Sequence, residues 1–361
     1  PQPTPAPTKF DTAKAGTQPK PPRLAQNGKL WPQWQAEGAA LAQAKLDATL
    51  LWIKTQEDAG LSVIGDGEMS RQHFVHGFLE QVAGIDRVNK VEMGIRNDRY
   101  KALVPQVVAP LALQGRVHQA EARFLRAHTT RQVKFTLPGP MTICDTVADR
   151  FYGDRVKMAF AFAELLNQEA LALEADGVDV IQFDEPAFNV YMDEAADWGV
   201  KALERAAQGL GTWSAAHRGR ACKTAVHIFN GYGIEANVQW KKTLGQEWRQ
   251  YERVFPALAA SRIDQVSLEC FHSHVPPDLI ALLAGKEVMV GVIDVASDEI
   301  ETPEQVADTI GTALRFVPRD KLIACTNCGL APMRREVAEA KLAALVAGAR
   351  LATERLARAA A

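Results

Sequence analysis

The sequence predicts an α/β protein folded as a single (β/α)8, or TIM, barrel, with a β-hairpin inserted after the second strand-helix unit. Short apolar runs alternate with longer amphipathic segments of helical spacing, which is typical of parallel strands joined by crossover helices. Eight such runs occur in 361 residues, with no Pro/Gly/Ser linker that would divide the chain. A doubly wound open sheet is the alternative, but eight consecutive units favour the closed barrel.

The predicted strands are short apolar runs bounded by polar residues, glycine or proline. In chain order they are Phe10–Gly16, Leu61–Gly65, Val133–Leu137, Val178–Phe183, Lys223–Ile228, Ile263–Leu268, Glu287–Ile293 and Lys321–Ala324. Helical spacing is clear from Gln35 to Ala59 and from Arg334 to Ala360, where the last helix would close the ring. Residues 1–9 are Pro-rich and predict an extended or disordered lead-in, so we expect the catalytic barrel over residues 10–361.

One stretch between the second and third runs does not continue the repeat. From Val88 to Val117 the residues alternate in polarity around the turn-like centre Arg96-Asn97-Asp98-Arg99. Alternation with a central turn indicates two antiparallel strands. The sequence therefore predicts an inserted hairpin arm at about residues 85–118.

Composition excludes several functional classes. The formal net charge is -2 and 47% of the residues are hydrophobic. Without a basic run there is no electrostatic footprint for nucleic acid or an anionic membrane surface. No stretch approaches the roughly 18 uninterrupted apolar residues of a membrane helix, and the chain does not open like a signal peptide. Five irregularly spaced cysteines do not form a disulfide framework, so we expect a protein of the reducing cytoplasm.

Chemically active residues cluster at the predicted strand ends, where a barrel builds its active site. In chain order the strand ends carry Gly16-Thr17, Asp66-Gly67-Glu68, Pro138-Gly139-Pro140, Asp184-Glu185-Pro186, His227, Glu269-Cys270, Asp294 and Cys325 to Gly329. Carboxylates, an imidazole and thiols are therefore expected to face one mouth.

Each of these residues also has a structural explanation. A single strand-end histidine such as His227 is more often a hydrogen-bonded core residue than a ligand. Asp184 and Glu185 are candidates for helix caps, and Asp66 for a turn residue before glycine. Glu269 is harder to explain in this way, because a carboxylate directly after an apolar strand is costly to bury without a charged partner.

The thiols point to a metal rather than to redox chemistry. Cys325 and Cys328 form a CxxC, but there is no second CxxC for a zinc knuckle and no helix directly after it for a thioredoxin-type pair. Histidine, glutamate and cysteine from three strand ends instead suit a mononuclear zinc site, whose fourth position stays open for water or substrate. That arrangement is typical of catalytic zinc.

Five segments at strand ends resemble the catalytic barrel of cobalamin-independent methionine synthase, in its short "core" form with one barrel. They are Ala15-Gly-Thr-Gln-Pro-Lys20, Gly65-Asp-Gly-Glu68, Leu137-Pro-Gly-Pro-Met-Thr142, Ile181-Gln-Phe-Asp-Glu-Pro-Ala187 and Thr326-Asn-Cys-Gly-Leu330. The resemblance runs from about Lys14 to the last helix. It implies a zinc-dependent methyltransferase that moves a methyl group to the thiol of homocysteine to form methionine.

The resemblance also implies roles for individual residues. Zinc would be held by His227, Glu269 and Cys328, and would lower the pKa of the homocysteine thiol so that the thiolate exists at neutral pH. The substrate ammonium would pair with two carboxylates, those of Glu68 and Asp184.

By the same resemblance, the backbone at Gly16 and the hydroxyl of Thr17 would bind the substrate carboxylate. No side chain beyond the metal site is assigned a catalytic role by the motifs.

The first departure from the family pattern concerns the metal. The family has a cysteine ligand two residues after the histidine, whereas this chain has Phe229, which strand geometry places on the same face as His227. Three interpretations stay open: the site works with three protein ligands, Cys270 or Cys222 substitutes, or metal binding is weakened or lost.

Two further departures concern the methyl donor. Thr146 stands where the large folate-dependent enzymes have a tryptophan that stacks on the pterin, and Ala296 where they have a histidine. Both argue against a directly bound methyl-tetrahydrofolate polyglutamate. The donor would then be a methylated corrinoid protein, or another donor supplied with a partner protein. The arm at Val88 to Val117 is either a docking element for that partner or a loop cover over the barrel mouth.

Two alternative functions remain open at this point. One is a zinc-dependent alkyltransferase for another thiol, of the coenzyme M type. Glu68 and Asp184 favour an amino-acid thiol instead, because two carboxylates suit an ammonium group. The other is a metal-free binding barrel, for which Phe229 is the main argument.

Overall fold

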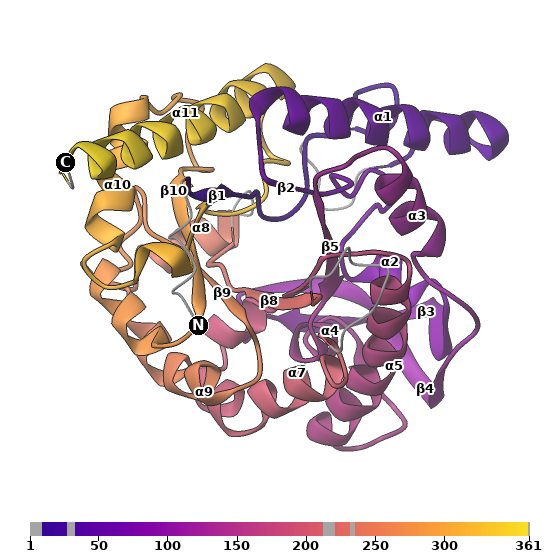
Figure 1. The fold of residues 1–361 in the computed structure, drawn as a ribbon. Coiled ribbons are helices and arrows are strands. Elements are labelled where there is room, and N and C mark those ends of the chain that lie inside the picture. The colour runs from indigo at the N-terminus through magenta and orange to yellow at the C-terminus, as the bar shows by residue number, and fades with distance from the viewer. Residues whose placement is uncertain (1–8, 27–32, 212–220, 232–234, 360–361) are drawn as a thin grey trace.

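The computed structural model describes residues 9–26, 33–211, 221–231 and 235–359. Eight parallel strands form a ring surrounded by helices (Figure 1), in the order β1-β11-β10-β9-β8-β7-β5-β2. In chain order they are β1 (Asp11–Thr12), β2 (Val63–Ile64), β5 (Gln132–Pro138), β7 (Val180–Asp184), β8 (Lys223–His227), β9 (Gln265–Glu269), β10 (Glu287–Ile293) and β11 (Leu322–Thr326).

The two ends of this ladder, β1 and β2, meet and nearly close the ring. The backbone N–H of Ser62 donates to the carbonyl of Thr12 at 3.1 Å, and the N–H of Thr12 donates to Ser62 Oγ at 3.2 Å. The predicted (β/α)8 barrel is therefore confirmed. The carboxyl ends of all eight strands point to the same mouth, because the strands are parallel.

The later six strands lie within two residues of their predicted bounds, but β1 and β2 are shorter than predicted. After β1 the chain turns at Gly16, whose φ is +59°, so the ladder stops before the predicted end of that run. After β2 the backbone of Gly65 bonds to a helix side chain instead of a strand: its N–H donates to Gln56 Oε1 at 3.0 Å, and its carbonyl accepts from Gln56 Nε2 at 2.8 Å.

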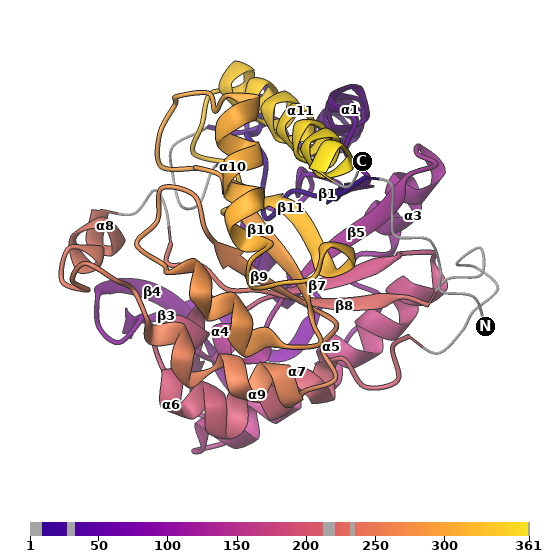
Figure 2. The ribbon, with the colours of Figure 1, turned by 60° about the vertical axis from the view of Figure 1, so that its left-hand side comes forward.

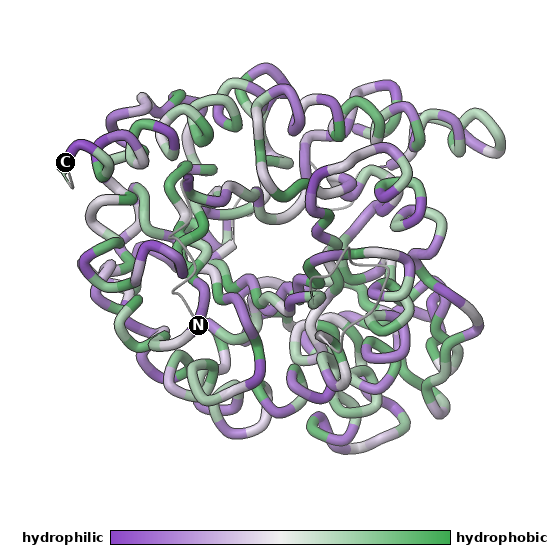
Figure 3. Tube along the Cα trace, viewed as in Figure 1, coloured by the Kyte–Doolittle hydropathy of each residue, from purple (hydrophilic) through white to green (hydrophobic). Residues whose placement is uncertain are grey.

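The first and last long helices, α1 (Gly38–Ala59) and α11 (Arg335–Ala359), lie next to each other on the outside of the ring (Figures 1 and 2). The other longer helices are α3 (Gln119–Ala127), α5 (Arg155–Ala175), α7 (Val200–Ala206), α8 (Glu235–Lys241), α9 (Phe255–Ala260) and α10 (Pro303–Ala313). Hydrophobic and hydrophilic residues alternate along these helices (Figure 3), as expected where one face packs on strands.

Parts of the two predicted end regions lie outside the described residues. The Pro-rich lead-in falls there except for Lys9, and the predicted last helix residue, Ala360, falls there as well. None of the described helices is both long enough and apolar enough to cross a membrane.

The inserted arm is a long antiparallel hairpin, β3 (Val82–Ile95) and β4 (Tyr100–Leu113), which follows the short helix α2 (His76–Leu79). It begins and ends a few residues earlier than predicted, and β6 (Ala148–Asp149) adds a third strand beside β4. The predicted turn is correct. In Figure 2 the hairpin and α8 project on the same side of the barrel.

The interior of the barrel is filled by small and medium side chains, so it is a packed core rather than a pore. This inner cluster consists of Ala13, Ala15, Val63, Val180, Ala225, Met289, Ile323 and Cys325. A larger apolar layer lies between strands and helices and contains most of the buried residues. At the mouth, by contrast, several charged side chains are buried, among them Glu68, Asp184 and Lys134.

One buried carboxylate, that of Glu185, fastens β7 to the loop after β5. It accepts hydrogen bonds from the N–H groups of Met141 and Thr142, each at 2.9 Å, and from Thr142 Oγ1 at 2.7 Å. These groups open the helix α4 (Pro140–Cys144), so Glu185 caps that helix from a neighbouring strand. Burial raises the pKa of Glu185 to about 7, against the opposing effect of these hydrogen bonds.

Gly139 makes this contact sterically possible, and its replacement gives a stability test. A Cβ atom at Gly139 would lie 2.1 Å from Cδ of Glu185. We expect Gly139→Ala to displace the carboxylate and lower the free energy of unfolding by about 3 kcal/mol, measured by urea denaturation.

The matched control is Gly311→Ala, on the exposed side of α10, where an added Cβ meets no atom within 4 Å. It should raise the free energy of unfolding by about 0.5 to 1 kcal/mol, because alanine favours the helix. Equal stabilities for the two variants would contradict the role given to Glu185.

Candidate active site

Three adjacent strands end in the residues singled out from the sequence. Asp184 ends β7, His227 ends β8 and Glu269 ends β9. Asp184 and His227 are direct partners in the β7–β8 register. The three side chains therefore belong to one edge of the sheet, at the mouth.

His227 is fully buried and held on two sides. Its Nδ1 lies 2.7 Å from Ser267 Oγ on β9, and its ring stacks on Phe229 with centroids 4.9 Å apart and planes 26° apart. Burial, together with the charges of Lys134 and Lys14, lowers the pKa of His227 to about 3. The imidazole is therefore neutral at physiological pH, and its buried Nε2 has no hydrogen-bond partner in the described structure.

Glu269 and Cys328 lie close enough to influence each other. Glu269 is buried and accepts a hydrogen bond from the N–H of Asn230 at 3.0 Å. Burial raises the pKa of the Cys328 thiol well above its usual range, and the negative charge of Glu269 raises it further. The positive charge of Lys241 lowers the pKa of Cys328 only in part, so the thiol stays protonated.

These residues fit zinc by the kind of atom they offer. Imidazole nitrogen, carboxylate oxygen and thiolate sulfur are the donors that zinc takes, and the orphan Nε2 of His227 is a ligand atom without a partner. Yet across residues 9–26, 33–211, 221–231 and 235–359, no three side chains of His, Cys, Asp or Glu are gathered closely enough to hold a metal ion. Metal binding would thus require these side chains to move together.

The two substitute thiols suggested by the sequence are differently placed. Cys222 precedes β8 at its amino end, roughly 16 Å along the strand from His227, so its proposed substitution as a ligand is wrong. Cys270 follows Glu269, and its backbone N–H continues the ladder to the carbonyl of Gly291 at 3.2 Å. Its thiol donates to the carbonyl of Leu268 at 3.5 Å, and burial, aided by the charge of Glu269, raises its pKa to about 12.

Two carboxylates, Glu68 and Asp184, share a buried part of the mouth. Thr17 Oγ1 donates to Glu68 Oε2 at 2.6 Å, while Glu68 Oε1 is buried without a hydrogen bond in the described structure. Asp184 accepts from Gln182 Nε2 at 2.8 Å and does not cap a helix. Burial and the charge of Glu68 raise the pKa of Asp184 to about 8. A bound cationic group would give Glu68 Oε1 a partner and would lower the pKa of Asp184.

The loops after β1 and β11 meet backbone to backbone. A Cβ atom at Gly16 would lie 2.9 Å from the Cα of Gly329, and one at Gly329 would lie 2.6 Å from the nitrogen of Thr17. Only glycine allows this approach, which brings Gly16 and Thr17 beside Cys328. The structure thus joins the predicted carboxylate-binding loop to a predicted metal ligand.

Sequence reasoning missed the cations of the mouth. The ammonium of Lys14 donates to the carbonyl of Gly16 at 2.6 Å, and Arg71 pairs with Asp66 at 3.0 Å. Lys20 and Lys134 are also buried. Of these residues only Lys20 lies in a motif quoted above, Ala15 to Lys20, and none was given a role. The lysine inside the apolar run at Phe10–Gly16 was a signal of buried charge.

The hairpin tip is fixed over the mouth. Arg96 pairs with Asp145 after α4, and the N–H of Asn97 donates to the hydroxyl of Tyr191 at 2.8 Å. The guanidinium of Arg99 lies 3.2 Å from the ring centroid of Trp240 on α8. These contacts favour the interpretation of the arm as a cover for the mouth.

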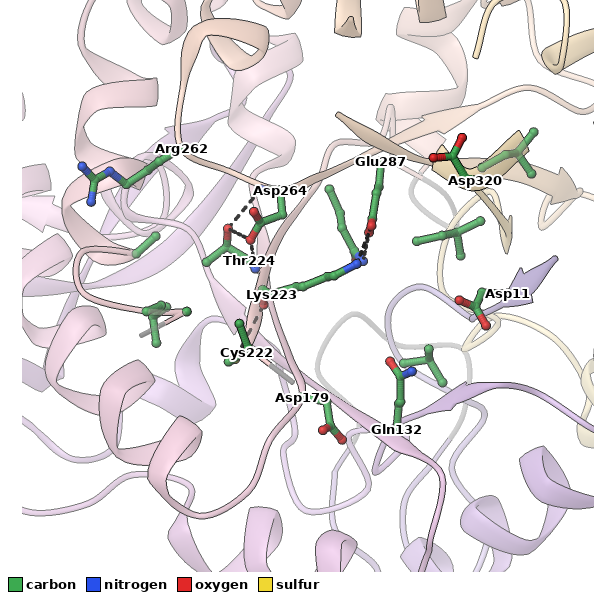
Figure 4. Close-up of a pocket in the computed structure, with 18 of the residues that line it drawn as sticks. Asp11, Gln132, Asp179, Cys222, Lys223, Thr224, Arg262, Asp264, Glu287 and Asp320 are labelled. Atoms are coloured by element: carbon green, nitrogen blue, oxygen red, sulfur yellow. Dashed lines mark hydrogen bonds and ion pairs between the residues drawn. The ribbon is translucent and has the colours of Figure 1, made fainter. Parts of the chain in front are cut away.

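A separate cavity of about 760 Å³ lies at the opposite, amino-terminal end of the barrel (Figure 4). Its polar groups largely satisfy one another: Lys223 pairs with Glu287, and Asp264 accepts from the hydroxyl of Thr224 at 3.0 Å. This end of a barrel contributes to stability rather than chemistry. The predicted site residues lie at the other end.

The model of the family described as "Cobalamin-independent synthase, Catalytic domain" matches residues 10–351. Methionine synthase of Saccharolobus islandicus is 28% identical over 350 residues, covering 96% of each chain. That of Sulfurisphaera tokodaii is 27% identical over 346 residues, covering 96% of this chain and 93% of its own.

Solved structures agree with this result. A B12-independent methionine synthase from Shewanella sp. W3-18-1, in complex with selenomethionine, is 51% identical, with a TM-score of 0.91 over 97% of this chain and 99% of its own. A putative enzyme of the same kind from Listeria monocytogenes is 17% identical with a TM-score of 0.68, a likeness of fold alone. The chain therefore belongs to the cobalamin-independent synthase catalytic-domain family and is a methyltransferase of the methionine synthase type.

Proposed function

We propose that this chain methylates the thiol of homocysteine to form methionine, using zinc and a donor other than directly bound methyl-tetrahydrofolate polyglutamate. The observation that carries the proposal is the buried pair Glu68 and Asp184: Glu68 Oε1 has no hydrogen bond in the described structure, and burial and the charge of Glu68 raise the pKa of Asp184 to about 8. An amino-acid ammonium would donate to Glu68 Oε1 and favour the ionised form of Asp184. The relative from Shewanella was solved with selenomethionine, an analogue of the proposed product.

The carboxylate pair also separates the proposed substrate from other thiols. Because the pKa of Asp184 is raised to about 8, the pair holds a proton at neutral pH when no ligand is bound. An ammonium group placed beside Glu68 and Asp184 would favour the fully ionised form. Coenzyme M carries a sulfonate instead, which two carboxylates would repel.

His227, Glu269 and Cys328 are the residues that would hold zinc. A zinc ion bound there would lower the pKa of a thiol, so that the nucleophilic thiolate exists at neutral pH. Two of these residues are already suited to bind a metal. His227 is neutral, and Ser267 holds its ring through a hydrogen bond to Nδ1. The backbone N–H of Asn230 holds the Glu269 carboxylate through a second hydrogen bond. Cys328 is protonated in the metal-free chain, so metal uptake would release its proton.

The transfer itself is an in-line displacement. The substrate sulfur attacks the methyl carbon, a sulfur–carbon bond forms, and the bond to the donor breaks with its electron pair leaving on the donor. The thiol proton passes to solvent. Glu68 and Asp184 orient the amino acid, and the hairpin tip on Asp145 and Tyr191 limits access of water.

The donor side of the mouth offers no folate platform at the expected position. Thr146 Oγ1 donates to the carbonyl of Ile143 at 2.9 Å, so this side chain serves the turn after α4. We therefore favour a methylated corrinoid protein, or another donor supplied with a partner protein. Five free thiols fit a reducing cytoplasm as the place of the reaction.

A second candidate function is a binding barrel without metal. Two observations favour it. Phe229 stacks on His227, and in the described part of the chain no three His, Cys, Asp or Glu side chains lie close enough together to hold a metal ion. Metal analysis separates the two.

Zinc content is the first prediction. Protein expressed with ample zinc should contain about one zinc per chain by elemental analysis, and Cys328→Ala should lose it because a thiolate donor is removed. Phe229→Cys should bind zinc more tightly by adding a fourth donor. Cys222→Ala, at the far end of β8, is the control and should keep its zinc. A zinc-free wild-type protein would favour the binding barrel.

Proton release is the second prediction. A ligand ammonium needs Asp184 ionised, so the affinity for L-methionine should rise about tenfold per pH unit from pH 6 and level off above about pH 8. Calorimetry at pH 7 in two buffers of different ionisation enthalpy should show release of close to one proton. Asp184→Asn should bind more weakly, without this pH dependence. A flat profile for the wild type would refute the role of Asp184.

Donor use is the third prediction. The isolated chain, supplied with homocysteine and zinc, should form no methionine from methyl-tetrahydrofolate, because Thr146 and Ala296 offer neither a stacking ring nor a proton donor. A methylated corrinoid should be tested as a separate donor by the same methionine assay. Turnover with methyl-tetrahydrofolate alone would contradict our interpretation of both positions.

A further inference from the structure

One buried hydroxyl close to the proposed metal ligands has no role so far. Tyr251 is only 1% exposed, and no described group accepts a hydrogen bond from its hydroxyl. A buried tyrosine usually gives its proton to an acceptor, because an unpaired polar group is costly to bury. A phenylalanine would fill the same space without that cost. The hydroxyl of Tyr251 therefore indicates a function beyond packing.

This tyrosine lies on the short 3-10 helix η4 (Gln250–Arg253), which is attached to both loops that follow the strands of the proposed ligands. After β8, Gln250 Nε2 donates to Asn230 Oδ1 at 3.0 Å. After β9, the carbonyl of His274 accepts from the N–H of Trp248 at 2.7 Å. These two bonds place η4 beside the ends of β8 and β9, which carry the histidine and glutamate of the proposed metal site.

Glu269 is the charge that acts most strongly on Tyr251. Burial raises the pKa of Tyr251 well above its usual range, and the negative charge of Glu269 raises it further. Cys270 and Cys328 act in the same direction but more weakly. The hydrogen bonds agree with this placement, because Asn230, whose side chain is bonded to η4, also donates its backbone N–H to Glu269 Oε1 at 3.0 Å.

The amide of Asn189 does not satisfy the hydroxyl proton. It lies beside Tyr251 as a donor and partly offsets the rise in the pKa, but a donor cannot accept the proton. Its NH₂ group also donates to the carbonyl of Phe229. The ring of Tyr251 stacks on Phe255 with centroids 5.2 Å apart, which holds the phenol in one orientation. The proton is therefore available to an acceptor on the side of the metal ligands.

We propose that Tyr251 is a positioning residue of the metal centre, whose hydroxyl donates a hydrogen bond to the Glu269 carboxylate and holds it where it binds zinc. This inference rests on the proposed function and deepens it. An ionised carboxylate has about four lone-pair sites, so Glu269 can accept from Asn230 and Tyr251 and still bind a metal. Such support is important in this chain, because Phe229 leaves only three protein ligands.

Removal of the hydroxyl alone tests the assignment. Tyr251→Phe keeps the ring that stacks on Phe255 and deletes only the donor. Its affinity for zinc, measured by competition with a chromophoric chelator, should fall about 10- to 100-fold, as is typical when a group that orients a metal ligand is lost. Tyr152→Phe is the matched control. Its hydroxyl accepts from the N–H of Leu111 at 3.2 Å on the hairpin, so its affinity for zinc should stay that of the wild type.

Cobalt(II) in place of zinc identifies the ligand that the hydroxyl contacts. Cobalt binds the same kinds of donor, and its coloured complexes report on the ligands. The thiolate charge-transfer band would report on Cys328, the one thiolate of the three proposed ligands, whereas the ligand-field bands report on the whole geometry. Tyr251→Phe should shift the ligand-field bands and leave the charge-transfer band in place. A shift of the charge-transfer band would assign the hydrogen bond to Cys328 and overturn the assignment to Glu269.

Thermal unfolding separates this role from a contribution to packing. Metal-free Tyr251→Phe should unfold at the same temperature as the metal-free wild type or higher, because the variant lacks a buried hydroxyl without an acceptor. Added zinc should then raise the unfolding temperature of the variant less than that of the wild type. A less stable metal-free variant with unchanged zinc affinity would show that the hydroxyl serves the fold and would refute the proposal.

The remaining outcomes distinguish this inference from the proposed function. If the wild type and Tyr251→Phe bind zinc equally well, the role of Tyr251 is wrong and the proposed function stands. If the wild type binds no zinc, the proposed function fails first and this inference fails with it.

Discussion

The burial of charge at the mouth of the barrel is the constraint on which the rest of the site depends. Parallel strands deliver Asp184, His227 and Glu269 to one edge, and the loops after β1 and β2 add Lys20 and Glu68. Burial disfavours the charged form, so it raises the pKa of Asp184 and of the Cys328 thiol and lowers the pKa of His227 and Lys20. The mouth is therefore prepared for ligands that bring the missing charges: a metal cation and a zwitterion.

A few close backbone contacts give this charged region its shape. Gly16 and Gly329 approach too closely for any side chain, which sets the loop carrying Thr17 against the loop carrying Cys328. Gly139 leaves room for the carboxylate of Glu185, which ties two neighbouring strands together. These contacts are steric, so they position the polar side chains without using the charges themselves.

The fold and many site residues were predictable from the sequence. The periodic alternation of apolar runs and helical segments determined the barrel, because eight parallel strands bury their apolar residues best in a closed ring. The polar residues directly after those runs, such as His227 and Glu269, were then expected at the mouth. Strand lengths at β1 and β2 were not predictable, because the glycine turn and the Gln56 side chain that end them act through tertiary contacts.

By itself, the sequence determined the topology, the family and which strand ends carry chemistry, since all three follow from local pattern and order along the chain. Only the tertiary structure decided which polar groups are paired. It showed that Thr17 donates its proton to Glu68, that Glu185 caps a helix, and that Nε2 of His227 is buried without a hydrogen-bond partner among the described residues. Pairing depends on distances between segments far apart in sequence, and local pattern contains no information about them.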